Sequence, residues 1–328
     1  MESAIILREH GGPETLQSAS IDVAGPGPGL LRIRQTAIGV NFHDIYVRTG
    51  LYRTLELPGI PGLEAAGYVE SVGEGVSGFV PGDRVAYVSP GYGGYASARL
   101  LRAEDAIRLP DALDDIAAAG SLMKALTVCM LVRRVHLVLP GQAILVHAAA
   151  GGVGQMLCRW ASHLGATVIG TVGSEAKAAI ARQSGAAHTI LYRAENIASR
   201  VANITGGAGV AAAYDSIGAD TFSASLDALG YEGRLVSFGQ ASGPVAPFPP
   251  SALAVRSLSV SRPIIFHYLR TREMRDELAA ETFAAFGDGI IRPARALRFP
   301  LSQAAEAHRL LERGESPGAL VLQPDAHA

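Results

Sequence analysis

Apolar residues in the middle of the chain occur in short continuous runs, and stretches with helical spacing separate them. This alternation predicts six strands, at 143–148, 167–172, 188–192, 211–215, 234–238 and 258–261. Helices are predicted between them, notably over 174–184, 195–203 and 220–229. Continuous apolar strands joined by helices are typical of a parallel sheet that helices cover. We therefore predict a doubly wound, six-stranded Rossmann sheet, and thus an α/β protein, with this domain over residues 125–265.

The first 124 residues have a different pattern. Their short apolar runs, at 30–38, 66–72 and 84–88, are separated by Gly-Pro and Pro-Gly pairs. Such pairs mark turns, so this part is expected to be a mostly antiparallel, barrel-like β domain. The last part of the chain predicts helices over 272–286 and 302–313 and a final strand over 318–322. We expect residues 1–124 and 266–328 to form one substrate domain into which the Rossmann domain is inserted.

A glycine-rich segment, His147-Ala-Ala-Ala-Gly-Gly-Val-Gly154, follows the first strand of the predicted Rossmann sheet and precedes a helix. Aligned with the dinucleotide fingerprint G-x-G-x-x-G, it places Ala149, Gly151 and Gly154 at the three small positions. The N–H groups at the start of the helix can bind a pyrophosphate. The alternative, a glycine turn that only connects a strand to a helix, is disfavoured by this strand–loop–helix context.

The end of the second strand indicates which dinucleotide binds. An NAD site carries an acidic residue there, but this chain has Val172 and Gly173. The missing carboxylate and the nearby Lys177 favour NADPH, with its additional phosphate. Ser174 can donate a hydroxyl, and Tyr192 can either stack near the adenine or form a hydrogen bond to the phosphate. Lys177 can also be read as an ordinary solvent-exposed helix lysine.

Composition excludes several other classes of protein. The 328 residues are 48% hydrophobic and 18% charged, and the net charge of −2 gives no basic surface for nucleic acid or membrane. The two cysteines, Cys129 and Cys158, are too few for a disulfide framework, and Cys158 is expected to be buried. With no signal sequence and no uninterrupted apolar run of transmembrane length, we expect a soluble, cytoplasmic protein.

The segment Gly39–Tyr52, GVNFHDIYVRTGLY, resembles the signature of the zinc-free quinone oxidoreductases. This zeta-crystallin-like group is a branch of the medium-chain dehydrogenase/reductase superfamily. Shorter matches extend over nearly the whole chain, at Gly11–Glu14, Gly62–Gly67, Pro81–Val85, Lys124–Thr127, Tyr214–Gly218, Val236–Gly239 and Ser261–Pro263. Each is weak alone, but their order and spacing make the resemblance specific.

The resemblance implies a GroES-like substrate domain, a Rossmann domain and hydride transfer from NADPH. It places Asn41, Asp44, Tyr46 and Thr127 beside the nicotinamide. Around the phosphates and the adenosine, the expected cofactor residues are Ala149, Gly151, Gly152, Val153, Gly154, Thr171, Gly173, Ser174, Lys177 and Tyr192. The rest of the cofactor trough is expected to be Ser216, Phe238, Gly239, Gln240 and Ile264. His43 replaces an aliphatic residue and is expected to have no chemical duty.

No metal is expected. Zinc alcohol dehydrogenases of this superfamily carry a cysteine where Asn41 stands and a histidine where Leu63 stands, and neither residue here is a zinc ligand. The nine histidines also form no cluster with metal-ligand spacing. Without a metal to stabilise an alkoxide, alcohol oxidation is disfavoured. The substrate is expected to be electrophilic already, as a quinone or an activated alkene is.

The predicted catalytic residues are Asn41, Tyr46, Arg48 and Tyr52. Either tyrosine can bind the developing oxyanion or pass a proton to it, and Arg48 can assist electrostatically. Alternatively, both tyrosines only line the cleft with their rings. The predicted function is an NADPH-dependent quinone oxidoreductase. The alternatives are an enone, alkenal or enoyl reductase on the same scaffold and a zeta-crystallin-like binding or structural protein. The strand at 258–261 predicts a homodimer.

Overall fold

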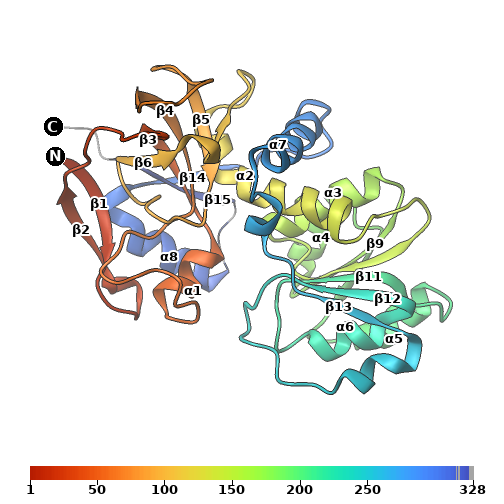
Figure 1. Ribbon diagram of the computed structural model, residues 1–328. Coiled ribbons are helices and arrows are strands. Elements are labelled where there is room, and N and C mark those ends of the chain that lie inside the picture. Colours follow the sequence, from red (N-terminus) through yellow and green to blue (C-terminus); the bar gives the residue numbers. More distant parts are fainter. Residues whose placement is uncertain (315, 317, 325–328) are drawn as a thin grey trace. The chain divides into compact units, whose positions relative to one another are not determined.

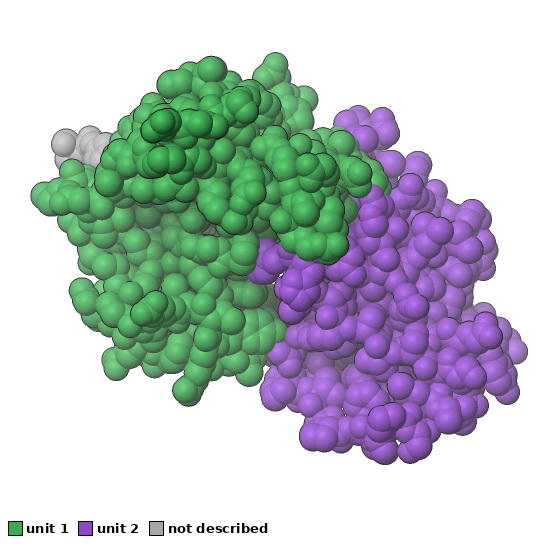
Figure 2. Space-filling model, in the orientation of Figure 1, with its two compact units in different colours: residues 1–123, 269–283, 293–328 green, residues 124–268, 284–292 purple. Residues whose placement is uncertain are grey.

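A computed structural model describes residues 1–314, 316 and 318–324 of the protein (Figure 1). The chain divides into two compact units (Figure 2). The first, here called the terminal unit, contains residues 1–123, 269–283 and 293–328. The second, the central unit, contains residues 124–268 and 284–292.

The central unit is built on a six-stranded parallel sheet in the order β10-β9-β8-β11-β12-β13. Its strands are β8 (Ala143–Val146), β9 (Thr167–Val172), β10 (His188–Leu191), β11 (Val210–Asp215), β12 (Leu229–Ser237) and β13 (Ser259–Ser261). The order reverses beside β8, which is the switch point of a doubly wound Rossmann sheet. The predicted fold class is therefore confirmed.

Four helices of the central unit pack on this sheet. They are α3 (Gly152–His163), α4 (Glu175–Gln183), α5 (Ile197–Ile204) and α6 (Phe222–Ala228). Helices α3 and α4 contact the β8–β10 side, and α6 contacts β11 and β12. Leu145, Ile169 and Leu235 are among the fully buried side chains of the core between these layers. Burying a side chain of this size contributes about 1.5–3 kcal/mol to stability.

The terminal unit contains a seven-stranded sheet in the order β14-β15-β3-β4-β5-β7, with β6 paired to β3. Its strands are β3 (Leu30–Val40), β4 (Glu64–Val72), β5 (Arg84–Val88), β6 (Ala98–Arg102), β7 (Ala106–Arg108), β14 (Ala296–Pro300) and β15 (Ala319–Gln323). A separate hairpin is formed by β1 (Glu2–Leu7) and β2 (Leu16–Ile21). All pairs are antiparallel except β14 with β15, which agrees with the expected antiparallel character.

Four further helices complete the described secondary structure, with short 3₁₀ segments. The helices are α1 (Phe42–Arg48), α2 (Asp115–Met130), α7 (Arg272–Gly287) and α8 (Ala304–Arg313), and a π-helical turn, Leu131–Val135, follows α2. The 3₁₀ segments are Pro13–Thr15, Ala103–Asp105, Pro250–Arg256, Ile265–Tyr268 and Leu301–Gln303.

Helix α2 and the turn after it, Asp115–Val135, are long and apolar enough to cross a membrane by length and composition alone. Gly120 and Lys124 interrupt this stretch, so the sequence did not predict a span. In the structure 67% of its most apolar window is buried. Such burial is typical of a core helix.

Both cysteines lie inside the protein. Cys129 and Cys158 are fully buried, as was expected for Cys158. Burial raises the pKa of the Cys158 thiol to about 12. The thiol form, rather than the thiolate, is therefore present at neutral pH.

Candidate active site

The glycine loop connects the end of β8 to the start of α3. Gly151 is the N-cap residue of the helix, and the N–H groups of Gly152, Val153 and Gly154 have no acceptor inside it. A Cβ on Gly154 would lie 2.2 Å from the carbonyl oxygen of Ala148, so only glycine fits there. The chain thus approaches itself closely and presents unpaired donors, which is what binding of a pyrophosphate requires.

A buried chain of polar side chains lies beneath this loop. Nδ1 of His147 is 3.0 Å from Oγ1 of Thr171, and its Nε2 is 2.9 Å from Oγ of Ser225. Ser225 in turn donates to Asp215, at 3.2 Å. Burial lowers the pKa of His147, although Asp215 acts in the opposite direction. The chain ties the ends of β8, β9 and β11 together, and Thr171 serves as a partner of His147 in it.

The residues expected at the adenosine phosphate lie close together after β9 and β10. A Cβ on Gly173 would be 3.1 Å from Oη of Tyr192, so the tyrosine ring lies against this glycine. Ser174 is the N-cap of α4, and its Oγ accepts a hydrogen bond from the backbone N–H of Lys177 at 3.3 Å. The guanidinium of Arg193 is 6.0 Å from the Tyr192 ring. Sequence reasoning missed this second cation, which directly follows Tyr192, two residues after β10 ends.

The remaining cofactor candidates of the central unit follow β11 and β12. A Cβ on Gly239 would be 2.4 Å from the carbonyl oxygen of Ser216, so the two loops are in close contact. Arg262 holds the second loop by donating to the carbonyl groups of Ser237 and Gly239, at 2.9 and 3.2 Å. Phe238 and Gln240 flank Gly239, and Ile264 is 47% exposed. These residues lie at the carboxyl ends of parallel strands, where Rossmann sheets bind dinucleotides.

In the terminal unit, Asn41 and Asp44 form a capping box at the start of α1. Nδ2 of Asn41 donates to Oε2 of Glu64 at 2.8 Å, and Oε1 of Glu64 accepts the N–H of Met123 at 2.6 Å. Asp44 accepts a hydrogen bond from Tyr95 at 3.1 Å. Asn41 is thus held by the fully buried Glu64, which sequence reasoning did not single out.

Arg48 has a role that the sequence did not predict. Its side chain is only 1% exposed and forms an ion pair with Glu312 of α8. The pair attaches α1 to α8. Arg48 is therefore engaged with a carboxylate of the protein, which argues against direct electrostatic assistance to the reaction.

Tyr46 and Tyr52 lie in a group of four half-buried aromatic side chains, here called the aromatic cluster, which also contains His43 and Tyr92. The ring centroids of Tyr46 and Tyr52 are 5.1 Å apart, and those of His43 and Tyr52 are 5.3 Å apart, both edge to face. Nε2 of His43 is 3.2 Å from Oη of Tyr92. Burial lowers the pKa of His43 to about 4. Tyr92 was not among the predicted residues, and its one sequence signal is the surrounding Gly91-Tyr92-Gly93-Gly94.

The residues at the positions of the zinc ligands in zinc alcohol dehydrogenases do not suit zinc. Leu63 is a fully buried apolar residue, and the Asn41 amide is bonded to Glu64. Within residues 1–314, 316 and 318–324, no group of three or more His, Cys, Asp or Glu side chains could hold a metal ion.

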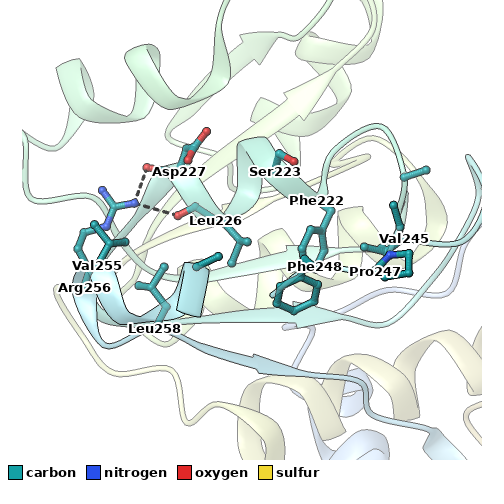
Figure 3. A pocket seen from close by; sticks show the side chains of 13 residues that line it. Phe222, Ser223, Leu226, Asp227, Val245, Pro247, Phe248, Val255, Arg256 and Leu258 are labelled. Carbon is teal, nitrogen blue, oxygen red and sulfur yellow. Dashed lines mark hydrogen bonds between the residues drawn. The ribbon is translucent and has the colours of Figure 1, made fainter. Parts of the chain in front are cut away.

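A pocket of about 330 Å³ lies in another part of the central unit (Figure 3). Phe222, Leu226 and Phe248 provide apolar walls, and Arg256 donates to the carbonyl groups of Leu226 and Asp227 at 3.1 and 3.2 Å. No expected cofactor or catalytic residue is among those described as lining it. The pocket is therefore separate from the candidate active site.

Comparison with known proteins identifies the family. Residues 27–111 match the alcohol dehydrogenase GroES-like domain, and residues 152–281 match the zinc-binding dehydrogenase family. The chain is 44% identical to a quinone oxidoreductase of Salmonella typhimurium and 43% identical to a 2-haloacrylate reductase of a Burkholderia species, over 99% of this chain and 100% of each relative.

A solved structure supports the same assignment. The Escherichia coli quinone oxidoreductase in complex with NADPH is 41% identical, with a TM-score of 0.95 over 98% of this chain and 100% of that one. The two chains are similar in both sequence and fold over nearly their full length. The chain therefore belongs to the quinone oxidoreductase family of the medium-chain dehydrogenase/reductase superfamily.

Proposed function

We propose that this protein is an NADPH-dependent oxidoreductase that reduces small quinones by metal-free hydride transfer. The observation that carries the proposal is full-length similarity to quinone oxidoreductases, one of them solved with NADPH. The uncharged Val172–Gly173 strand end and the nearby Lys177 support NADPH in place of NADH.

The residues of the central unit fit this cofactor. We assign the pyrophosphate to the N–H groups of Gly152, Val153 and Gly154, and the additional phosphate to Ser174 and Lys177. When bound, NADPH supplies the hydride. The two compact units support a substrate domain of residues 1–124 and 266–328 and a cofactor domain of residues 125–265, except that residues 284–292 belong to the central unit.

The terminal unit supplies the groups that face the substrate. We assign to Tyr46 and Tyr52 the hydrogen bonds to the oxygen on which negative charge develops. Asn41 and Asp44 hold the start of α1, which carries Tyr46, in place. Arg48, through Glu312, positions the same helix and is a positioning residue rather than a catalytic one.

Steady-state kinetics test this proposal. We expect the protein to oxidise NADPH when benzoquinone or phenanthrenequinone is present. The kcat/KM for NADPH should be much higher than that for NADH. Absence of quinone-dependent NADPH oxidation by folded protein would refute the proposed activity. A fluorescence titration with NADPH distinguishes the proposed enzyme from a non-enzymatic binding or structural protein. The enzyme predicts quenching by NADPH, and the alternative predicts none.

A second candidate is reduction of an activated alkene, such as an alkenal or an acrylate. The 43% identity to a 2-haloacrylate reductase favours it specifically. This reaction adds the hydride to a β carbon and then requires a proton at the α carbon. A higher kcat/KM for 2-chloroacrylate or an alkenal than for any quinone would select this candidate.

We also propose a cytoplasmic homodimer. Strand β13 stands at one end of the six-stranded sheet, so its outer edge can pair with the same strand of a second copy. Sedimentation at micromolar concentration tests this assembly, and the mass of a monomer would contradict it.

A further inference from the structure

Three side chains of the terminal unit form a hydrogen-bonded row next to the tyrosines already assigned to the substrate. Oη of Tyr92 lies between Nε2 of His43, at 3.2 Å, and Oγ1 of Thr54, with which it is in hydrogen-bond contact. His43 connects this row to the rest of the aromatic cluster through its edge-to-face contact with Tyr52. The row therefore connects Thr54 and Tyr92 to the candidate active site.

The hydrogen-bonding capacity of Tyr92 indicates what the row can do. A phenol hydroxyl donates one hydrogen bond and accepts two. His43 is neutral at ordinary pH, because burial holds its pKa at about 4. When Nε2–H of His43 and the hydroxyl of Thr54 both donate to Tyr92, the Tyr92 O–H is directed to a third acceptor. Burial raises the pKa of Tyr92, although the hydrogen bond with Thr54 acts in the opposite direction, so the phenol is protonated at neutral pH and can donate.

The backbone of Tyr92 has an unusual conformation for a residue with a large side chain. Tyr92 has φ +40°, the left-handed region that a bulky residue rarely adopts. Gly91, Gly93 and Gly94 surround it, and glycine would adopt this conformation without strain at position 92 as well. Strained non-glycine residues of this kind are concentrated at functional sites. The observed strain therefore points to a function for the Tyr92 side chain.

We propose that Tyr92, supported by His43 and Thr54, donates a hydrogen bond to the carbonyl oxygen of the substrate and stabilises the negative charge that forms there. The inference rests on the proposed function and deepens it. Reduction of a quinone adds one hydride and one proton, so negative charge forms on an oxygen before that oxygen takes the proton from water. Tyr46 and Tyr52 in one segment and Tyr92 in another would then give this oxygen donors from two separate segments of the chain.

The first test replaces Tyr92 by phenylalanine, which removes Oη and keeps the ring. We expect kcat/KM for benzoquinone to fall roughly 10- to 100-fold, since loss of one donor to a developing oxyanion has effects of this order or larger. The Kd for NADPH, measured by fluorescence, should not change. The matched control is Tyr68→Phe, at a 40% exposed tyrosine of β4 outside the aromatic cluster, which should retain wild-type kinetics.

A second readout does not depend on turnover. Hydroquinone binding to the NADP⁺-saturated protein, measured by calorimetry, should weaken several-fold in Tyr92→Phe and remain unchanged in Tyr68→Phe. Should Tyr92→Phe fail to fold, Thr54→Val at an exposed position removes one supporting donor, and a several-fold loss in kcat/KM is expected.

His43 is tested as a supporting residue by two variants. His43→Phe retains an aromatic ring without a donor and should lose activity, whereas His43→Gln retains a donor and should recover most of it. In the double variant with Tyr92→Phe, the His43→Phe change should add little, because its effect acts through Oη.

The outcomes separate the two hypotheses. Wild-type protein without quinone-dependent NADPH oxidation refutes the proposed function. An active wild type together with an unchanged kcat/KM and unchanged hydroquinone binding in Tyr92→Phe overturns the present inference alone. A Tyr92→Phe variant that loses kcat/KM and NADPH affinity to the same extent would also overturn it, because equal losses indicate a structural defect.

Discussion

Replacing Gly154 by alanine tests whether close packing of the glycine loop is required for cofactor binding. The new methyl carbon would lie 2.2 Å from the carbonyl oxygen of Ala148 and 2.8 Å from Cα of Ala149. Carbon and carbonyl oxygen atoms usually stay about 3.3 Å apart, so the loop must move by roughly 1 Å. Ala148 already has φ +50°, which leaves its backbone few alternatives. Overpacking of this kind costs about 1–3 kcal/mol.

We expect this cost to appear mainly in the affinity for NADPH, because the loop that moves carries the N–H donors of α3. If all of it falls on the bound conformation, Kd rises by about 5- to 150-fold. A fluorescence titration measures Kd, and a thermal melt measures the share of the cost that falls on stability. Gly287→Ala is the control, since its Cβ would meet nothing within 4 Å. Wild-type NADPH affinity and melting temperature in Gly154→Ala would refute the reasoning.

Three further predictions concern pH, cofactor choice and the buried ion pair. Burial and the nearby Arg48 lower the pKa of His308 from 6.5 to about 3. As the pH falls from 6.5 towards 3, the unfolded chain therefore takes up this proton before the folded state does, and the free energy of unfolding decreases by up to about 4 kcal/mol. His308→Gln should therefore flatten the fall of the melting temperature over this range, and an unchanged slope would contradict the assignment. Gly173→Asp places a carboxylate beside Tyr192, so the ratio of kcat/KM for NADPH to that for NADH should fall at least roughly tenfold; a constant ratio would place the phosphate elsewhere. Glu312→Gln leaves the buried Arg48 without a counter-charge and should cost about 1–3 kcal/mol in urea unfolding, discounted because Glu312 is 34% exposed; no loss would show the pair to be dispensable.

The central sheet could be predicted from the sequence because its strands are buried on both faces and are therefore continuously apolar. All six predicted strands are present, although β12 begins at Leu229 rather than at residue 234. Several elements of the terminal unit were not predicted. Strands β2, β6 and β7 are short or partly exposed, so they carry little apolar signal, and α1 has only seven residues. Strand β1 is apolar and largely buried, but the sequence analysis did not single it out.

The candidate site was predictable only where its chemistry is local. The glycine loop and the end of β9 are each a few consecutive residues, so their spacing alone indicates a phosphate site. The contact between His43 and Tyr92 joins residues 49 positions apart, and that between Arg48 and Glu312 joins residues 264 positions apart. Neither partner is recognisable until the chain has folded. For this reason the sequence suggested no role for His43 and a catalytic one for Arg48.

The burial of both cysteines has a consequence for an enzyme that handles electrophiles. Quinones and activated alkenes add covalently to thiolates, and the thiolate rather than the thiol is the reactive form. Cys129 and Cys158 are inaccessible, and the raised pKa of Cys158 keeps its sulfur protonated. Burial therefore protects both thiols from alkylation by the proposed substrates.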